Sequence, residues 1–271
     1  MDAPIVIREL TTLDDFQQCV EIQKQVWGFD DPYDIVPLPL LLVSQRHEGV
    51  VLGGFAGDRM IGFVYSLPGI YHGHKLQWSH MLAVVPEYRN SDIGYRLKMS
   101  QYQMSQERGY QYIEWTYDPL ESKNAYFNLN KLGCIAKEYE VNIYGETSSP
   151  LHMGMPTDRL VAHWLIPPLN KESIDTDRLP EPPALITHCR SDQEVLLIEG
   201  ADLKATGQFL FIEIPPEIQV LKLYSQKAAM DWRMQTRAIF QHYLESGYVV
   251  YSFFHWKKTR PNRSFYILKK T

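Results

Sequence analysis

The main candidate for a functional motif is one stretch of the sequence, Val84-Val85-Pro86-Glu87-Tyr88-Arg89-Asn90-Ser91-Asp92-Ile93-Gly94-Tyr95-Arg96-Leu97. The pattern predicts a strand that runs into a tight turn, with a helix that begins directly after the turn. The first N–H groups of a helix lack partners within the helix and lie at the positive end of its dipole, so this turn could bind a pyrophosphate. Gly94 would let the backbone approach phosphate oxygens without a Cβ, and Arg89 would add a cationic contact.

This stretch lies within an alternation of strands and helices that is typical of an α/β fold. Thr11, Thr12 and Asp14 offer N-cap chemistry for a first helix that ends at Val26. Ala56-Gly57-Asp58-Arg59 predicts the turn of a hairpin. The predicted strands cover residues 5–10, 50–55, 60–68, 77–85, 111–117 and a strand pair within 134–144; further helices are predicted over residues 93–108 and 122–132.

The strand, turn and helix resemble the cofactor motif of the GNAT acetyltransferase superfamily, V-x-P-x-x-R-x-x-G-x-G. The later Asn124-Ala125 and Lys131-Leu132-Gly133 are similar to that family's A-x-x-L-Y-x-K-x-G-F. The resemblance implies an α/β fold of the GNAT type, a mixed central sheet flanked by helices, over residues 1–166. It also implies acetyl-CoA or another acyl-CoA as co-substrate, bound by Leu82, Ala83, Val84, Arg89, Asn90, Ser91, Asp92, Ile93, Gly94, Ser122 and Asn124.

The chain departs from the family pattern at four positions. Asp92 stands where the family's first Gly usually lies, and its charge would face the pyrophosphate unless the side chain turns away. Ser122 replaces an Asn, and both residue types can cap a helix. Cys134 replaces a Phe, and Leu129 stands where the family usually has the Tyr that protonates the CoA thiolate.

Acyl transfer to an amine needs a group that takes the amine's proton, and His80 is the first candidate. On a strand it would share one face with Leu82 and Val84, and a His with a pKa near 6.5 is partly neutral at pH 7. The alternative is a His that is hydrogen-bonded within the sheet. Glu114 is the second candidate, because partial burial in mid-strand would raise its pKa; its alternatives are a solvent-facing residue and an ion-pair partner.

Tyr126 is the candidate for the acid, because it lies three residues before Leu129 and thus on the same helical face. The alternative is a Tyr that packs against the sheet. The acceptor pocket is expected among Trp27, Phe29, Tyr33 and Tyr71, whose rings would suit an apolar amino acid or a related small amine. The motif does not distinguish acetyl from a larger acyl group such as succinyl.

Two further patterns have a structural explanation as well as a functional one. The histidines of His72-Gly73-His74, with His80 nearby, are of a type that binds metal ions. No carboxylate or Cys completes a ligand set, so an exposed loop without a metal ion is expected. Arg233 and Arg237 lie one helical turn apart and could hold an anionic substrate group. A surface ion-pair face with Asp231 or Glu245 is the usual explanation for such a pair.

Composition excludes several classes of protein. With 27 Lys and Arg against 32 Asp and Glu, the chain has a net charge of -5 and no overall field that would attract nucleic acid. The 3 cysteines are far apart and show no metal spacing, which favours a reducing compartment. Residues 1–10 lack a signal-peptide pattern, and the apolar run at residues 36–43 is too short for a bilayer. A cytoplasmic protein without membrane or nucleic-acid partners is expected.

The last third of the chain is expected to form a smaller α/β unit. A Pro-rich connector over residues 167–185 precedes strands at 195–198, 209–214, 248–255 and 264–268 and a helix over 218–245. The order echoes the end of the first half, so a degenerate GNAT-like half is one interpretation of residues 186–271. The strands are nearly continuous in apolar residues and must be covered by their own helix, by the first half, or by a second subunit in a homodimer.

Two classes of function remain. The first is an N-acyltransferase that moves an acyl group from acyl-CoA to the amine of a small molecule. The second is a non-catalytic GNAT-like module that binds acyl-CoA or serves in an interaction, which Leu129 and Asp92 favour. Arg89 and Gly94 agree with cofactor binding in either case.

Overall fold

The computed structural model describes residues 4–29, 31–71, 73–89, 91–145, 153–172, 185–192, 195–256 and 263–271. The chain folds into two compact units. Of the described residues, unit 1 contains 4–115 and 165–168, and unit 2 contains the remainder. The predicted domains, residues 1–166, 167–185 and 186–271, differ from this division and stay a prediction about which segments fold on their own.

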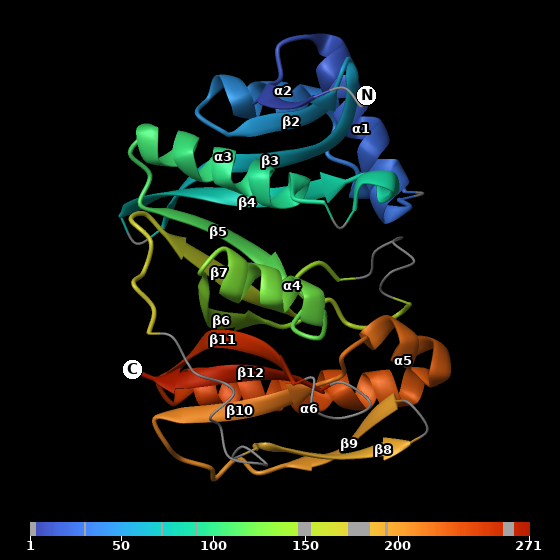
Figure 1. The fold of residues 1–271 in the computed structure, drawn as a ribbon, viewed down its shortest axis with the longest axis vertical. Coiled ribbons are helices and arrows are strands. Elements are labelled where there is room, and N and C mark those ends of the chain that lie inside the picture. The colour runs from blue at the N-terminus through green and yellow to red at the C-terminus, as the bar shows by residue number, and fades with distance from the viewer. Residues whose placement is uncertain are drawn as a thin grey trace. The chain divides into compact units, whose positions relative to one another are not determined.

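Unit 1 is a mixed sheet with helices on its faces, which confirms the predicted α/β class (Figure 1). Its strands follow the order β1-β2-β3-β4-β5, antiparallel except for the parallel pair β4 and β5. The elements in chain order are β1 (Ile5–Glu9), α1 (Leu13–Trp27), α2 (Leu38–Arg46), β2 (Val51–Ala56), β3 (Arg59–Tyr71), β4 (His74–Val84), α3 (Ile93–Glu107) and β5 (Tyr112–Tyr117), whose last two residues belong to unit 2.

The first helix begins where the sequence predicts. Thr12 accepts a hydrogen bond from the Asp15 N–H at 3.1 Å, and the Asp15 carboxylate accepts the Thr12 N–H at 3.1 Å, which completes a capping box. Gly28 ends the helix at φ 64°, and its N–H donates to the Lys24 carbonyl. The local signals at both ends of α1 therefore fix its length.

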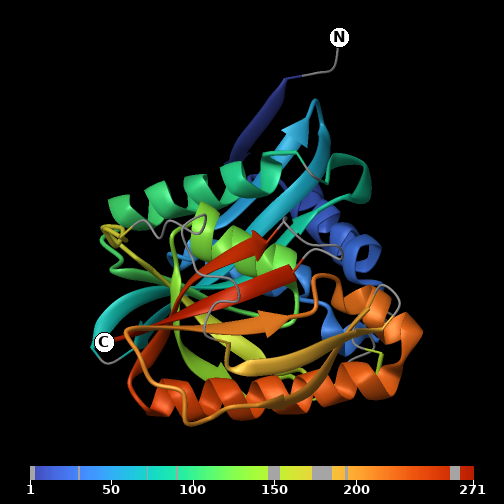
Figure 2. The same ribbon diagram turned by 60° about the horizontal axis from the view of Figure 1, so that its bottom comes forward.

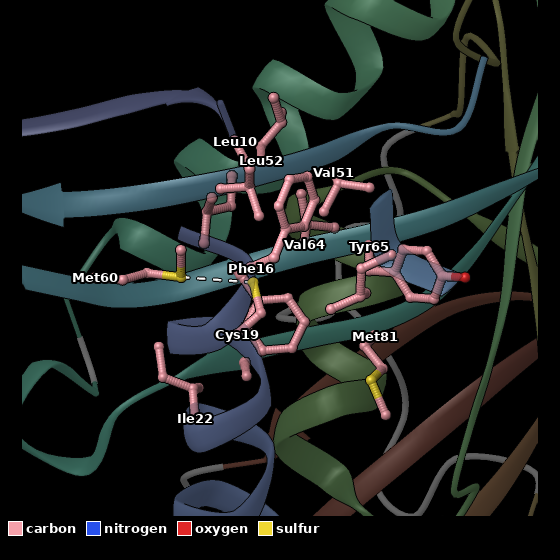
Figure 3. Packing of buried hydrophobic residues seen from close by; sticks show 14 of the residues in the cluster. Leu10, Phe16, Cys19, Ile22, Val51, Leu52, Met60, Val64, Tyr65 and Met81 are labelled. Atoms are coloured by element: carbon pink, nitrogen blue, oxygen red, sulfur yellow. Dashed lines mark hydrogen bonds between the residues drawn. The ribbon is translucent and has the colours of Figure 1, made fainter. Parts of the chain in front are cut away.

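The core of unit 1 lies between α1 and the strands (Figure 3). Phe16, Cys19 and Ile22 face the strands at helical spacing, and the Cys19 thiol donates to the Met60 sulfur at 3.6 Å. From α3, Ile93 and Leu97 are also fully buried. Burial of one such side chain stabilises the fold by about 1.5–3 kcal/mol, so the start of α3 is held firmly by its own first turn.

No helix is predicted from the sequence over residues 36–43, and the structure corrects this with α2. Pro37 is the N-cap of this helix and Pro39 lies in its first turn. Proline is tolerated there because the N–H groups of the first turn have no partner within the helix. The two prolines thus mark the beginning of a helix rather than an interruption.

Unit 2 has strands in the order β7-β6-β11-β12-β10 and a separate pair, β8 and β9, with α6 packed against β6, β9 and β11 (Figure 2). Its elements are α4 (Ser122–Tyr126), a π-helical turn (Phe127–Lys131), β6 (Ile135–Glu140), β7 (Arg159–Leu165), β8 (Thr187–Asp192), β9 (Val195–Ala201), β10 (Phe209–Ile214), α5 (Ile218–Tyr224), α6 (Gln226–Glu245), β11 (Tyr248–Trp256) and β12 (Arg263–Lys270). No helix in the described part of the chain has the length and apolar character needed to cross a bilayer.

Two predicted elements of unit 2 are wrong in detail. The strand pair expected within residues 134–144 contains only β6, whose antiparallel partner is β7. The single helix expected over residues 218–245 is broken at Ser225, which is extended and accepts a hydrogen bond from the Ala228 N–H. A serine N-cap starts a new helix at that point because its hydroxyl satisfies an N–H of the first turn. Strand β8 was not predicted.

The last third of the chain is covered by residues of the first half. Val250 of β11 pairs with Ala136 of β6. The Asn130 side chain accepts the Phe253 N–H at 3.1 Å, and the Tyr266 hydroxyl donates to the Pro119 carbonyl at 2.8 Å. This confirms that the apolar C-terminal strands belong to a folded body.

The described beginning of the Pro-rich connector is anchored by Lys171. Its ammonium donates to the carbonyls of Leu129, Cys134 and Tyr251 at 2.9, 2.5 and 2.7 Å. Burial lowers the pKa of Lys171 to about 8, because these neutral partners do not replace water fully. Residues 173–184 of the connector lie outside the described residues.

Candidate functional site

Strand β4 is paired unequally on its two edges. Its antiparallel register with β3 runs from the pair Tyr71 and His74 to the pair Gly62 and Val84. Its parallel register with β5 covers only residues 76–78, opposite residues 112–114. Over residues 79–84, no described residue of β5 pairs with β4, so the backbone groups of this edge are available to an extended ligand.

A β-bulge lies where this unpaired edge begins. The register passes from the pair Ser66 and Ser79 to the pair Tyr65 and Met81, so His80 has no partner residue on β3. A bulge changes the direction of a side chain and bends the strand. His80 is exposed and Leu82 and Val84 are half-buried, whereas the residues between them are buried, which confirms that the three share one face.

His80 combines access to solvent with a desolvated environment. Its side chain is exposed, and its ring meets the buried ring of Tyr65 edge-on at 6.0 Å. Desolvation by the surrounding protein lowers the pKa of His80 from its usual 6.5. A lowered pKa favours the neutral form of the ring at pH 7. A neutral imidazole can accept a proton.

A buried lysine that was not among the predicted site residues marks the point where β4 and β5 stop pairing. The Lys98 ammonium, on α3, donates to the Ser79 hydroxyl at 3.0 Å and to the Gln101 amide oxygen at 2.8 Å. It also lies 3.5 Å from the centroid of the Trp115 ring, a cation–π contact. Ser79 and Trp115 directly follow the last paired residues, Trp78 and Glu114, so the ammonium lies between the two diverging strands.

The helix that follows the turn begins without a side-chain cap. Asp92 is its N-cap residue, and its carboxylate makes no capping bond, in contrast to the complete capping box of α1. The Ile93 N–H reaches the Ser91 hydroxyl only at a long 3.4 Å. The N–H groups at this helix start could therefore bind an anion.

The side chains of the turn leave the helix start accessible. Ser91 donates to the Tyr88 carbonyl at 2.5 Å, and Arg89 donates to the Val84 carbonyl at 3.4 Å. The side chains of Arg89 and Asp92 are exposed, and residue 90 lies outside the described residues, so the prediction for Asn90 is untested. An exposed guanidinium thus lies in the same turn as the uncapped N–H groups.

The space at Gly94 agrees with this use of the helix start. A Cβ at Gly94 would meet only the Val84 methyl group, at 3.8 Å, which is ordinary van der Waals contact. The fold itself therefore has room for a larger residue at this position. The turn fits the pyrophosphate of CoA, because it offers N–H groups, a nearby guanidinium and an open backbone approach.

The other predicted catalytic groups lie in different surroundings. Glu114 is 5% exposed and opposite Trp78 in the β4–β5 register, so the solvent-facing alternative is wrong. Tyr126 lies in unit 2, with its partly exposed ring 5.6 Å from that of His255. The sequence predicts one helical face for Tyr126 and Leu129, but the helix changes to a π-helical turn at Phe127.

The remaining predicted binding residues are divided between the units. Leu82, Ala83, Val84, Arg89, Ser91, Asp92, Ile93 and Gly94 form one strand, turn and helix start of unit 1. Ser122 and Asn124 belong to α4 in unit 2. Ser122 is buried and its hydroxyl donates to the Pro216 carbonyl at 2.5 Å, whereas Asn124 is exposed.

The aromatic acceptor pocket is found only in part. Trp27 and Phe29 stack with ring centroids 5.8 Å apart, and Trp27 meets Phe63 edge-on. Tyr33 is 97% exposed and Tyr71 is also exposed. The structure therefore joins two of the four predicted rings, and these pack against the core of unit 1.

The arginine pair differs from its predicted surroundings, whereas His74 is exposed as expected. Arg233 and Arg237 do not form a surface face with Asp231 or Glu245, because Arg233 pairs with Asp118 and Arg237 with Asp158, while Asp231 pairs with Lys227. His74 is hydrogen-bonded to Gln111 at 2.6 Å, and His72 lies outside the described residues. Within the described residues, no three His, Cys, Asp or Glu side chains are placed to hold a metal ion.

Solved structures of acetyltransferases are similar to this chain. The ribosomal-protein-S18-alanine N-acetyltransferase of Escherichia coli has a TM-score of 0.48 at 15% identity, over 63% of this chain and 99% of that one. An acetyltransferase of the GNAT family from Streptococcus pneumoniae has a TM-score of 0.48 at 16% identity, over 60% and 99%. The PaiA N-acetyltransferase of Thermoplasma acidophilum, solved with coenzyme A, has a TM-score of 0.41 at 19% identity, over 59% and 98%.

No protein-family model matches the sequence, and no curated protein matches it. At these identities and TM-scores, the case for a function rests on the register of β4, the uncapped helix start and the side chains beside them.

Lys98→Met is expected to lower both the melting temperature and the affinity for CoA. The substitution keeps the apolar stem but removes the two hydrogen bonds that the ammonium donates, while Ser79 and Gln101 remain hydrogen-bonded to each other, so a total loss of about 1–3 kcal/mol is expected. The matched control is Lys24→Met, whose exposed ion pair with Glu21 should contribute little. Differential scanning calorimetry with and without CoA measures both effects. Equal melting temperatures for the two variants would contradict the role of Lys98.

Proposed function

We propose that this protein transfers an acyl group from acetyl-CoA or another acyl-CoA to the amine of a small molecule. The observation that carries the proposal is the continuity of two features of unit 1. The unpaired edge of β4 over residues 79–84 leads directly into the uncapped start of α3. An extended chain that carries amides and ends in a pyrophosphate matches this pair of features, because a strand edge binds amides and a helix start binds phosphate.

The residues of the turn would hold the pyrophosphate. The N–H groups of the first turn of α3 are the donors, and Arg89 supplies a mobile cation at the surface. Asp92 would not compete for these donors, since its side chain makes no capping bond. Gly94 leaves room beside Val84 for close approach. When bound, acyl-CoA supplies a thioester carbonyl that an amine can attack.

His80 is the proposed general base. An aliphatic amine has a pKa near that of Lys, about 10.4, and is mostly protonated at pH 7, so the attack requires loss of a proton. His80 is exposed, neutral at that pH and directed by the bulge at the start of the free edge of β4. Glu114 is the second candidate, as a buried carboxylate on the neighbouring strand.

Tyr126 of unit 2 stays the sequence-based candidate for the acid that protonates the thiolate. Its ring is partly exposed on α4, whereas Leu129, which stands at the family's usual acid position, is fully buried. A non-catalytic acyl-CoA-binding module is the second function, and the buried Leu129 favours it. Thiol release from acetyl-CoA across a panel of small amines separates the two, because the module would bind CoA without turnover.

Gly94→Ala is expected to leave folding stability equal or higher by up to about 1 kcal/mol, because alanine favours a helix and its Cβ has room. The same Cβ would lie where the phosphates approach, so CoA affinity should fall by roughly tenfold, about 1.4 kcal/mol. Gly94→Glu should abolish binding through bulk and charge. Isothermal calorimetry measures the affinities.

The control for these two variants is Gly200→Ala in β9, where a Cβ would meet no atom within 4 Å. It should bind CoA as the parent does. Unchanged CoA affinity in Gly94→Glu would show that the cofactor site is misplaced.

His80→Ala is expected to lower turnover by roughly 10²-fold or more while the KM for acyl-CoA changes little. In the parent, activity should fall as pH drops through a value below 6.5, since desolvation lowers the pKa of His80 and the base acts only when neutral. His74→Ala, on the same strand but hydrogen-bonded to Gln111, is the control and should retain activity. Turnover of His80→Ala within about twofold of the parent between pH 6 and 9 would exclude this role.

A further inference from the structure

A pair of buried arginines in unit 2 shares one carboxylate. Arg233 of α6 donates from Nη2 to Asp118 Oδ2 at 2.6 Å, and Nη1 of Arg159, on β7, lies 3.9 Å from the same oxygen. Arg233 is 1% exposed and Arg159 is 9% exposed. The other oxygen of Asp118 accepts the Leu120 N–H at 2.8 Å. Two guanidinium charges thus meet one carboxylate charge.

The side chains of the neighbouring carboxylates are hydrogen-bonded to other residues, although the charge of Asp158 also acts on Arg159 and Arg233. Asp158 accepts two hydrogen bonds from Arg237, at 2.8 and 2.9 Å, and a third from the Tyr139 hydroxyl. Desolvation raises the pKa of Glu121, whose carboxylate accepts a hydrogen bond from Gln219 at 2.5 Å.

The charges within the cluster act on one another. Desolvation would raise the pKa of Asp118, but Arg233 and then Arg159 outweigh it and hold that pKa below its usual value. Desolvation lowers the pKa of Lys222, and the charges of Asp118 and Glu121 oppose this shift. Burial likewise lowers the pKa of Arg159, and the charge of Arg233 adds to that effect. The two guanidiniums therefore repel each other across Asp118, and a second anion would relieve this repulsion.

Arg233 has donors that nothing in the described part of the protein satisfies. Its Nε and Nη1 atoms are buried there without a hydrogen-bond partner. Almost all buried polar groups have partners, and an unsatisfied one costs about 1–3 kcal/mol, or more when it is charged. Oxygen atoms of an anion are the strongest acceptors for such donors.

Arg159 lies on the side of the cluster next to the exposed Tyr144. Its Nη1 donates to the Asp158 carbonyl at 2.9 Å, and its guanidinium lies 5.5 Å from the centroid of the Tyr144 ring. Tyr144 is exposed, and its hydroxyl is hydrogen-bonded to Thr116 at 2.7 Å. A ligand would enter beside Tyr144 and Arg159, with Arg233 behind them.

We infer that Arg159 and Arg233 bind the carboxylate of a small molecule. A carboxylate fits because its two oxygen atoms match the fork of guanidinium donors and it brings one charge into a desolvated site, whereas phosphate would bring nearly two.

The direct test measures binding without CoA, on the full chain at constant ionic strength. Acetate should raise the melting temperature saturably, because a ligand that binds only the folded state stabilises it by RT ln(1 + [L]/Kd). Arg159→Gln should lose this increment. Arg190→Gln is the matched control: its exposed ion pairs with Asp192 and Glu199 lie outside the cluster, so the variant should keep the full response to acetate.

Chloride and inorganic phosphate serve as the comparison anions. Equal increments from acetate, chloride and phosphate, or an undiminished acetate response in Arg159→Gln, would overturn the inference, since both outcomes describe a solvated structural cluster. Arg233→Gln should also lose the response, and Arg159→Gln answers the question even if Arg233→Gln does not fold.

Discussion

The buried ammonium of Lys98 is the constraint on which the rest of unit 1 depends. It contacts Ser79 on β4 and the Trp115 ring of β5, at the position where the next pair of the parallel register would form. A buried cation needs hydrogen-bond acceptors, and the Ser79 and Gln101 side chains supply them. The pairing of β4 with β5 stops beside this network, which leaves an edge of β4 unpaired over residues 79–84.

The features next to Lys98 follow one another along β4, the turn and the start of α3. The bulge at His80 begins one residue after Ser79 and directs a neutral imidazole along the face that Leu82 and Val84 share. The buried Ile93 and Leu97 fix the start of α3, so its uncapped N–H groups are held rather than frayed. A strand edge for amides, a base and an anion-binding turn thereby follow one another along a single continuous segment.

The strand, turn and helix of this segment could be predicted because their signals are local. The capping box of α1 and the apolar spacing of α3 lie within a few residues of the elements that they define. The free edge of β4 could not be predicted, since pairing with β5 depends on contacts between distant segments. For the same reason the predicted partner of β6 was wrong, and two ion pairs of α6 that connect distant segments were predicted as a surface face.

One pattern in the sequence indicates that Lys98 belongs to a buried polar network. The buried face of α3 contains Ile93, Leu97, Lys98, Gln101, Tyr102 and Ser105 at helical spacing. Half of that stripe is polar, and polar residues in a buried stripe indicate an internal network. The buried arginines of unit 2 had no comparable signal, because Asp118, Arg159 and Arg233 lie on three separate elements or loops.

Hydrogen–deuterium exchange of the backbone amides, with and without CoA, tests whether CoA binds along β4 and over the start of α3. If CoA lies along the free edge of β4 and over the start of α3, it should slow exchange within residues 79–84 and in the first turn of α3, while β2 and α1 remain unchanged. CoA binding that leaves the exchange of both segments unaltered would contradict the account.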